Sequence, residues 1–155
     1  MSALWRGAQV RMQAVTLADL PELLQVERLA YPHPWSETNF RDALACGYRA
    51  QMLVADGVVL GYYIAMHGVD EVHLLNITVA PAWQGQGWAR LMLDALGGWA
   101  RAQGAEWLWL EVREGNARAL RVYQAHGFRR VGYRKAYYPA RGGSREDAIV
   151  MSLRL

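Results

Sequence analysis

A single carboxylate interrupts an apolar stretch of the chain, at a position that suits proton transfer. Glu111 lies in the run 107–113, whose other central positions are tryptophan or aliphatic residues. A carboxylate that is partly removed from water becomes a stronger base, as a reaction that takes a proton from an amine near neutral pH requires. The spacing fits equally well a strand position that points to solvent or pairs with Arg113 or a neighbouring basic residue. The sequence leaves both possibilities open.

An asparagine and a tyrosine recur at helical spacing soon afterwards. Asn116 can cap a helix over 117–126, and Tyr123 follows two turns later on the same helical face. A tyrosine at such a position could act as a general acid that protonates a leaving group. A tyrosine on an amphipathic helix is also an ordinary core residue, and that packing role stays open for Tyr123.

A glycine-bearing turn lies between a predicted strand and a predicted helix. Pro81 stops the strand, Gly85 and Gly87 follow, and apolar residues then recur at helical spacing from Trp88 onward. Such a turn lets successive backbone N–H groups face one concavity at the positive end of a helix dipole, which favours a phosphate or pyrophosphate. The dinucleotide fingerprint would need a small residue at Arg90, and the P-loop pattern does not occur. A tight connection without a ligand also explains the glycines.

The composition is that of one globular domain, which we expect to span residues 1–155. Of the 155 residues, 53% are hydrophobic and 20% are charged, with a formal net charge of +3. These values argue against a disordered chain. No apolar run approaches the ~20 residues that a bilayer span requires, and the N-terminus has no signal-peptide core, so we expect a cytoplasmic protein that contacts no membrane.

Cysteine and histidine spacing predicts no metal site. Cys46 is the only cysteine in the sequence, which excludes an intrachain disulfide and a cysteine metal cluster. No histidine belongs to an i, i+4 pair or an HExxH pattern. The histidines are His33, His67, His73 and His126. We therefore expect no metal cofactor.

Turn and periodicity signals divide the chain into helices and strands. Asp56-Gly57 predicts a hairpin, and Gly127 ends a helix. This order predicts an α/β or α+β fold with a mixed sheet, in which the strand 107–113 is buried on both faces. The expected strands are 8–14, 50–55, 58–66, 72–79, 107–113, 128–136 and 148–155, and the expected helices are 20–30, 37–45, 88–104 and 117–126.

Six segments form an ordered series along the chain. They are Pro34-Trp35-Ser36, 76–79, 84–89, 109–116, 119–128 and 137–151. Together they closely resemble the RimI-type alanine N-acetyltransferases of ribosomal proteins, in the GCN5-related N-acetyltransferase (GNAT) superfamily, whose pyrophosphate loop is Q/R-x-x-G-x-G/A. The likeness covers most of the chain from Asp19 onward. It implies a twisted mixed sheet of about seven strands, splayed in the middle and flanked by about four helices.

The resemblance also assigns roles to residues at the matching positions. Glu111 would be the general base, and Tyr123 would be the acid that protonates the coenzyme A thiolate. An acceptor peptide would lie against Trp35, Tyr137 and Tyr138, the last two in a polar loop. Acetyl-CoA would be held by Ile77, Thr78, Val79, Gln84, Gly85, Gln86, Gly87, Trp88, Ala89, Arg90, Asn116 and Tyr123.

The implied reaction is direct transfer of the acetyl group, in a ternary complex, to the N-terminal alanine of the small-subunit ribosomal protein numbered eighteen. An α-amine suits direct attack because its pKa of about 7.7 to 8.0 leaves part of it neutral at pH 7. A lysine side chain or a small amine stays open as the acceptor. A non-catalytic RNA- or ribosome-binding module is a more remote alternative. We expect no direct nucleic-acid contact, because the basic residues are scattered, and we expect a monomer or weak dimer.

Three positions depart from the family's pattern. Trp88 stands where a smaller aliphatic residue is usual, Ala89 replaces the commoner glycine, and Gly115 stands where serine is usual. None of the three removes a proposed catalytic side chain. Their expected effect is therefore on cofactor affinity more than on activity.

Overall fold

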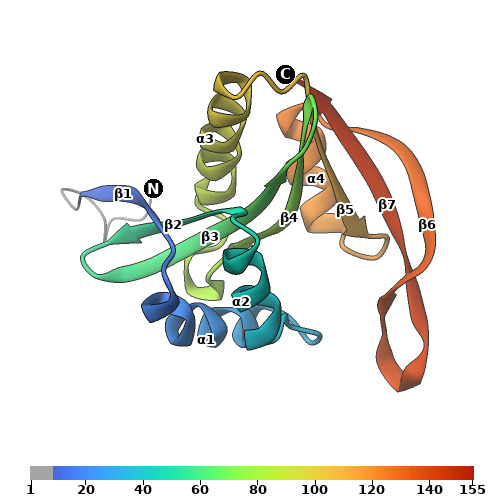
Figure 1. Cartoon of the computed structure of the whole chain (residues 1–155). Helices are drawn as coiled ribbons and strands as arrows, with labels where there is room; N and C mark the ends of the chain where they lie inside the picture. Colours follow the sequence, from blue (N-terminus) through green and yellow to red (C-terminus); the bar gives the residue numbers. More distant parts are fainter. Residues whose placement is uncertain (1–8) are drawn as a thin grey trace. The chain divides into compact units, whose positions relative to one another are not determined.

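The computed structural model of the chain describes residues 9–155 and contains a mixed sheet with helices (Figure 1). Among the described residues the sheet has seven strands in the order β1-β2-β3-β4-β5-β7-β6. This confirms the predicted fold class. The strands are β1 Val10–Ala14, β2 Arg49–Ala55, β3 Val58–His67, β4 Glu71–Val79, β5 Trp107–Arg113, β6 Arg129–Pro139 and β7 Arg145–Arg154; the α-helices are α1 Leu20–Ala30, α2 Glu37–Ala45, α3 Trp88–Ala102 and α4 Ala117–His126. Residue 8 of the predicted first strand lies outside the described residues.

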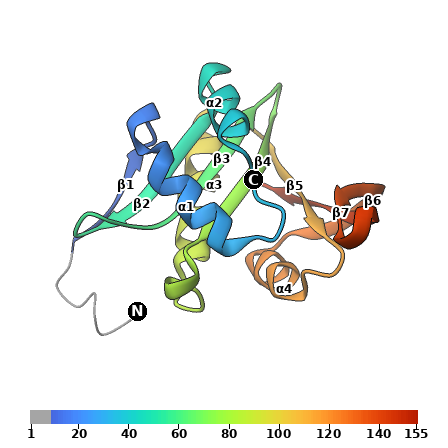
Figure 2. The same cartoon turned by 90° about the horizontal axis from the view of Figure 1, so that it is seen from below.

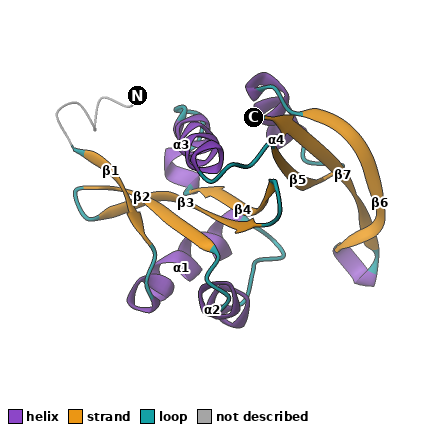
Figure 3. Ribbon diagram, turned by 45° about the horizontal axis from the view of Figure 1, so that its top comes forward, coloured by secondary structure: helices purple, strands orange, loops and turns teal. Residues whose placement is uncertain are grey.

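The chain divides into two compact units. The first unit contains Asn76–Met92 together with the residues up to Met66, and the second unit contains His67–Leu75 and Leu93–Leu155. The extent of a single domain over the whole chain stays a prediction. In the first unit, α1 and α2 lie on the same side of strands β1 to β3 (Figure 3). In the second unit, α4 lies beside β5, and β7 and β6 follow in the sheet (Figure 2).

Local sequence signals account for the elements of the first unit. The Asp56-Gly57 hairpin forms as predicted: Ala55 pairs with Val58, so the loop has two residues, and both of them adopt positive φ, 49° and 73°. Ser36 caps α2 by accepting a hydrogen bond from the amide of Asn39. The Ser36 cap therefore fixes the loop between α1 and α2 at the point where α2 begins.

Strand β5 differs from the prediction that it is buried on both faces. Leu108, Leu110 and Val112 are buried, and the alternate positions carry Trp109 and Glu111, which are only partly covered as whole residues. The strand thus has one apolar face and one amphipathic face. Tryptophan made the run look uniformly apolar, although a ring with a polar N–H is often found at half-buried positions.

The last two strands are longer than predicted. β6 runs to Pro139 and β7 starts at Arg145, so Tyr137 and Tyr138 belong to a strand and not to the expected polar loop. The register breaks between Arg134 and Tyr138, where Ala136 adopts a positive φ of 51°. A bulge of this kind lets a strand continue past a local irregularity and re-aims the side chains within it.

Candidate active site

Glu111 lies in the second unit as a buried carboxylate held on both of its oxygens. Its side chain is 6% exposed, and its Oε2 lies 2.6 Å from Nε2 of His73. Its Oε1 lies 3.1 Å from Nε of Arg134, a side chain that is 48% exposed. The alternative in which the carboxylate points to solvent is excluded. Glu111 pairs with other basic residues, His73 and Arg134, and not with its strand neighbour Arg113.

The register of two parallel strands explains why His73 and Glu111 meet. β4 pairs with β5 so that His73 is opposite Trp109, and Glu111 lies two residues further along the same face. The imidazole stacks on the Trp109 ring, with centroids 3.5 Å apart and planes 9° apart. The ring of His73 is therefore fixed in orientation as well as bonded.

Tyr137 and Tyr138 lie close enough to Glu111 to respond to its charge. Burial raises the pKa of both phenols, and the negative charge of Glu111 raises it further. Arg134 lies over the Tyr137 ring, with its guanidinium carbon 5.7 Å from the ring centroid, and Arg113 lies over the Tyr138 ring at 4.6 Å. Two tyrosines, two arginines and the carboxylate thus share one region of the second unit.

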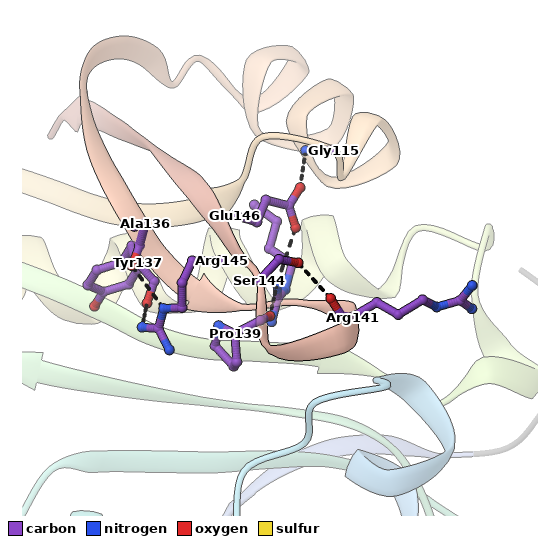
Figure 4. Close-up of polar contacts among 9 residues, drawn as sticks. Gly115, Ala136, Tyr137, Pro139, Arg141, Ser144, Arg145 and Glu146 are labelled. Carbon is purple, nitrogen blue, oxygen red and sulfur yellow. Dashed lines mark hydrogen bonds and ion pairs between the residues drawn. The ribbon is translucent and has the colours of Figure 1, made fainter.

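The backbone of the bulge that carries Tyr137 is held by side chains of β7, among them Arg145 (Figure 4). Arg145 donates from Nε to the carbonyl of Ala136 and from Nη2 to the carbonyl of Tyr137. Asp147 accepts the amide of Ala136. These contacts hold a segment that the sequence presented as a loop, so the two tyrosines stand on a rigid strand.

Glu146 links this hairpin to the start of α4. Its Oε2 accepts the amide of Gly115, and its Oε1 lies 3.2 Å from Nη1 of Arg113 (Figure 4). A Cβ atom at Gly115 would lie 2.7 Å from that Oε2 atom. Glycine at residue 115, where serine is usual, therefore leaves room for the Glu146 carboxylate, and a side chain there would displace it.

Asn116 caps α4 and Tyr123 lies within it, as predicted. The side-chain oxygen of Asn116 accepts the amide of Ala119, which confirms the predicted cap. Tyr123 is half-buried and packs edge-on against Phe128, with ring centroids 5.7 Å apart. The exposed Asn116 keeps its amide nitrogen for other contacts, and the acid role of Tyr123 stays a prediction.

The glycine turn of the first unit has the backbone that an anion site needs. Gly85 and Gly87 adopt positive φ of 76° and 88°, and Gln84 donates from Nε2 to the carbonyl of Val79, which ties the turn to the end of β4. Arg90 is exposed in the first turn of α3. Backbone N–H groups at a helix start beside an arginine fit a pyrophosphate.

Two side chains of this turn region each have a buried polar atom without a hydrogen-bond partner. Oε1 of Gln86 and Nε1 of Trp88 have no hydrogen-bond partner among the described residues. Trp88 is 3% exposed, so the larger ring at this position is accommodated in the core. Ala89 is half-buried.

A second buried carboxylate, Glu27 of α1, accepts hydrogen bonds from three groups of the first unit. It is 2% exposed, and its Oε1 accepts the hydroxyl of Tyr62 at 2.6 Å and Nδ2 of Asn76 at 3.1 Å. Its Oε2 accepts the backbone amide of Trp35 at 3.0 Å. The loop that carries Trp35 is therefore bonded to a residue in the core.

The backbone of β4 beyond Asn76 is held by the same group of residues. The hydroxyl of Tyr31 donates to the carbonyl of Ile77 and lies 2.9 Å from Oγ1 of Thr78. Thr78 is 2% exposed and donates to Oδ1 of Asn76. Burial is the main cause that raises the pKa of Tyr31 to about 12, and the charge of Glu27 adds to it. Ile77, Thr78 and Val79 are thus fixed in place before any ligand binds.

Sequence reasoning missed three members of these clusters. His73 was considered only as a metal ligand, Glu27 only as part of a helix face, and Arg134 not at all. A signal existed for Glu27, because it is a carboxylate on the apolar side of an amphipathic helix. The contact of His73 with Glu111 could be predicted only from the register of β4 with β5, which no local sequence pattern gives. Among the described residues, no group of three or more His, Cys, Asp or Glu side chains is placed to hold a metal ion.

Comparisons with known proteins agree with this architecture. The model of the acetyltransferase (GNAT) family matches residues 20–128. The chain is 37% identical to the [ribosomal protein bS18]-alanine N-acetyltransferase of Escherichia coli K12 over 92% of this chain and 95% of that protein. It is 34% identical to the protein of the same name from Haemophilus ducreyi, over 93% and 99%. The crystal structure of the ribosomal-protein-S18-alanine N-acetyltransferase from Escherichia coli matches with a TM-score of 0.86 at 36% identity, covering 94% of both chains.

Proposed function

Because the chain belongs to the acetyltransferase (GNAT) family, we propose that it transfers the acetyl group of acetyl-CoA to the N-terminal alanine of ribosomal protein bS18. The observation that carries the proposal is the paired, 6% exposed Glu111 beside two tyrosines, in a chain matched over nearly its whole length by enzymes of that name. None of the described helices is long and apolar enough to cross a membrane. A ribosomal substrate would place the enzyme in the cytoplasm.

Acetyl-CoA supplies the activated acetyl group, and the residues of the chain bind it and move protons. The exposed turn at Gly85 and Gly87 and the Arg90 guanidinium fit its pyrophosphate, and the fixed backbone of Ile77–Val79 offers peptide groups to the pantetheine arm. We assign further contacts to Asn116 and Tyr123. The side chains around the turn, Gln84, Gln86, Trp88 and Ala89, shape the loop.

Glu111 takes one proton from the acceptor α-ammonium, directly or through a water molecule, and the neutral amine attacks the thioester carbonyl. As the C–N bond forms and the C–S bond breaks, Tyr123 gives a proton to the departing thiolate, and the attacking nitrogen loses its second proton to water. The reaction proceeds without a covalent intermediate on the enzyme. The only cysteine of the sequence, Cys46, is exposed at the C-terminal end of α2 and is not assigned as a nucleophile. Trp35, Tyr137 and Tyr138 are proposed to contact the acceptor peptide.

Coenzyme A release measures the proposed reaction. The purified protein is given acetyl-CoA and a peptide that begins with alanine, beside the same peptide with a blocked N-terminus and an internal lysine. We expect turnover on the free α-amine only. Turnover on the blocked peptide would move the assignment to lysine side chains, and turnover on small amines alone would move it away from proteins.

A further inference from the structure

We propose that His73 is a positioning residue for Glu111, so that the imidazole and the carboxylate work as one unit in the proton-transfer step. The inference rests on the proposed function, because it concerns the base of that reaction. It adds a residue that neither the sequence pattern nor the resemblance assigns.

The contact is short, buried and directional. Nε2 of His73 lies 2.6 Å from Oε2 of Glu111, with side chains that are 11% and 6% exposed. An ionised carboxylate oxygen only accepts, so His73 donates from Nε2 when Glu111 is the free base. A charge-assisted hydrogen bond of this length in a desolvated place is among the stronger polar contacts a protein makes.

The imidazole cannot rotate out of this contact without losing a second one. It stacks on Trp109 at 3.5 Å and 9°, and Trp109 belongs to the same strand as Glu111. The carboxylate is fixed from its other side by Arg134 at 3.1 Å. His73 and Arg134 each contact one oxygen of Glu111, so the plane of the carboxylate is fixed. The lone pairs that accept no hydrogen bond from them therefore keep fixed directions.

Three strands, β5, β6 and β7, supply the groups around the pair. β6 contributes Arg134 and the phenols of Tyr137 and Tyr138, whose raised pKa keeps them neutral near pH 7. Beyond Tyr138, Glu146 of β7 is paired with Arg113 of β5. Donors from two strands, His73 of β4 and Arg134 of β6, therefore meet at the carboxylate of Glu111.

Three variants separate a positioning role from simple packing. His73→Phe keeps a flat ring on Trp109 but has no donor, and His73→Gln keeps a donor of similar reach but cannot carry a positive charge. His126→Gln is the matched control, because His126 also faces a carboxylate, Asp94, at 3.8 Å in the same unit. We expect kcat/KM for the alanine peptide to fall about 10- to 100-fold in His73→Phe. We expect recovery to within about threefold in His73→Gln and no change in His126→Gln.

The split between kcat and KM gives a readout that packing would not move. A carboxylate that is present but misdirected slows the proton-transfer step and leaves peptide binding intact, so we expect the loss in His73→Phe to fall on kcat, with KM for the alanine peptide little changed. We expect His73→Gln, which keeps the donor, to recover kcat.

The outcomes distinguish this inference from the proposed function. Wild-type-like kcat/KM in His73→Phe, or a loss in that variant that falls on KM alone, overturns the inference while acetyl transfer to the alanine peptide still stands. A wild-type protein that binds acetyl-CoA but acetylates no amine overturns the proposed function, and the positioning role of His73 falls with it. Loss of kcat in His73→Gln as large as in His73→Phe also contradicts the positioning role.

Discussion

Two buried carboxylates among the described residues have different kinds of partner. Glu27, in the first unit, accepts hydrogen bonds from a phenol, a carboxamide and a backbone amide. Glu111, in the second unit, faces an imidazole and a guanidinium. Both side chains are nearly inaccessible to solvent, so burial alone does not separate them.

The difference lies in what each environment can do with a proton. The donors around Glu27 are neutral groups with no charge change near pH 7, which suits an anchor that must keep one geometry. The partners of Glu111 are an imidazole and a guanidinium, donors that hold a carboxylate in one orientation for proton transfer. The comparison therefore predicts that damage at Glu27 appears in folding and damage at Glu111 appears in turnover.

The largest expected effect is the loss of turnover in Glu111→Gln. An amide cannot accept the amine proton, so kcat/KM for the alanine peptide should fall by about 10²- to 10⁴-fold. Coenzyme A release measures the loss, and urea unfolding should show little change. If Glu111→Gln kept its activity but lost stability, Glu111 would have a structural role like that of Glu27 and not a catalytic one.

The next effect is on stability, in Glu27→Ala. This change leaves the Tyr62 hydroxyl, the Asn76 amide and the Trp35 amide without their acceptor, and it opens a void in the core. We expect the free energy of unfolding to fall by about 2–4 kcal/mol, measured in urea. Glu27→Gln, which keeps one acceptor oxygen, should lose less and should mainly raise KM for the peptide through the Trp35 loop. Unchanged stability in Glu27→Ala would contradict the anchoring role.

A third effect should appear at alkaline pH in the first unit. The pKa of Tyr31 is raised to about 12, mainly by burial, so the folded state keeps its proton after the unfolded state has lost it. Stability is unaffected below about pH 10 and then falls with rising pH, by about 2–3 kcal/mol by pH 12. Urea unfolding between pH 9 and about 12 measures the slope. Tyr31→Phe should be less stable at pH 8 but should show a shallower alkaline slope, and an equal slope would remove Tyr31 as its source.

The smallest expected effect belongs to Arg134→Gln. Arg134 is 48% exposed, so solvent weakens its contact with Glu111, and the amide can still donate to the carboxylate. We expect kcat/KM to fall about three- to tenfold, less than for His73→Phe, with no change in acetyl-CoA binding. A loss larger than that of His73→Phe would show that Arg134 is the principal partner of Glu111.

Local signals predicted the parts of the fold that local chemistry determines. The Asp56-Gly57 turn, the Ser36 and Asn116 caps and the end of α4 at Gly127 all depend on residues within a few positions of one another. The bulge at Ala136 does not, because Arg145 and Asp147 of the next strand hold it. The tyrosines beside it were therefore assigned to a loop.

In the candidate site too, features set by neighbouring residues were predictable and features set by long-range contacts were not. Glu111 was identified because it is anomalous within its own strand, and the glycine turn because its spacing is characteristic. The pairing of His73 with Glu111 depends on how β4 and β5 align, since a shift of one residue would place the two side chains on opposite faces. Long-range register is information that a single sequence does not contain.

The β6 end of the sheet bears on how the protein behaves when it is concentrated. In the order of the described sheet β6 is the last strand, and a last strand is the place where another chain can add and start aggregation. The register of β6 with β7 is interrupted twice, which leaves the outer strand uneven. Its exposed side chains include the cations Arg129, Arg130, Arg134 and Lys135. A second copy approaching this strand would meet like charge and an irregular backbone, so the hairpin that carries the tyrosines is also protected against templated growth.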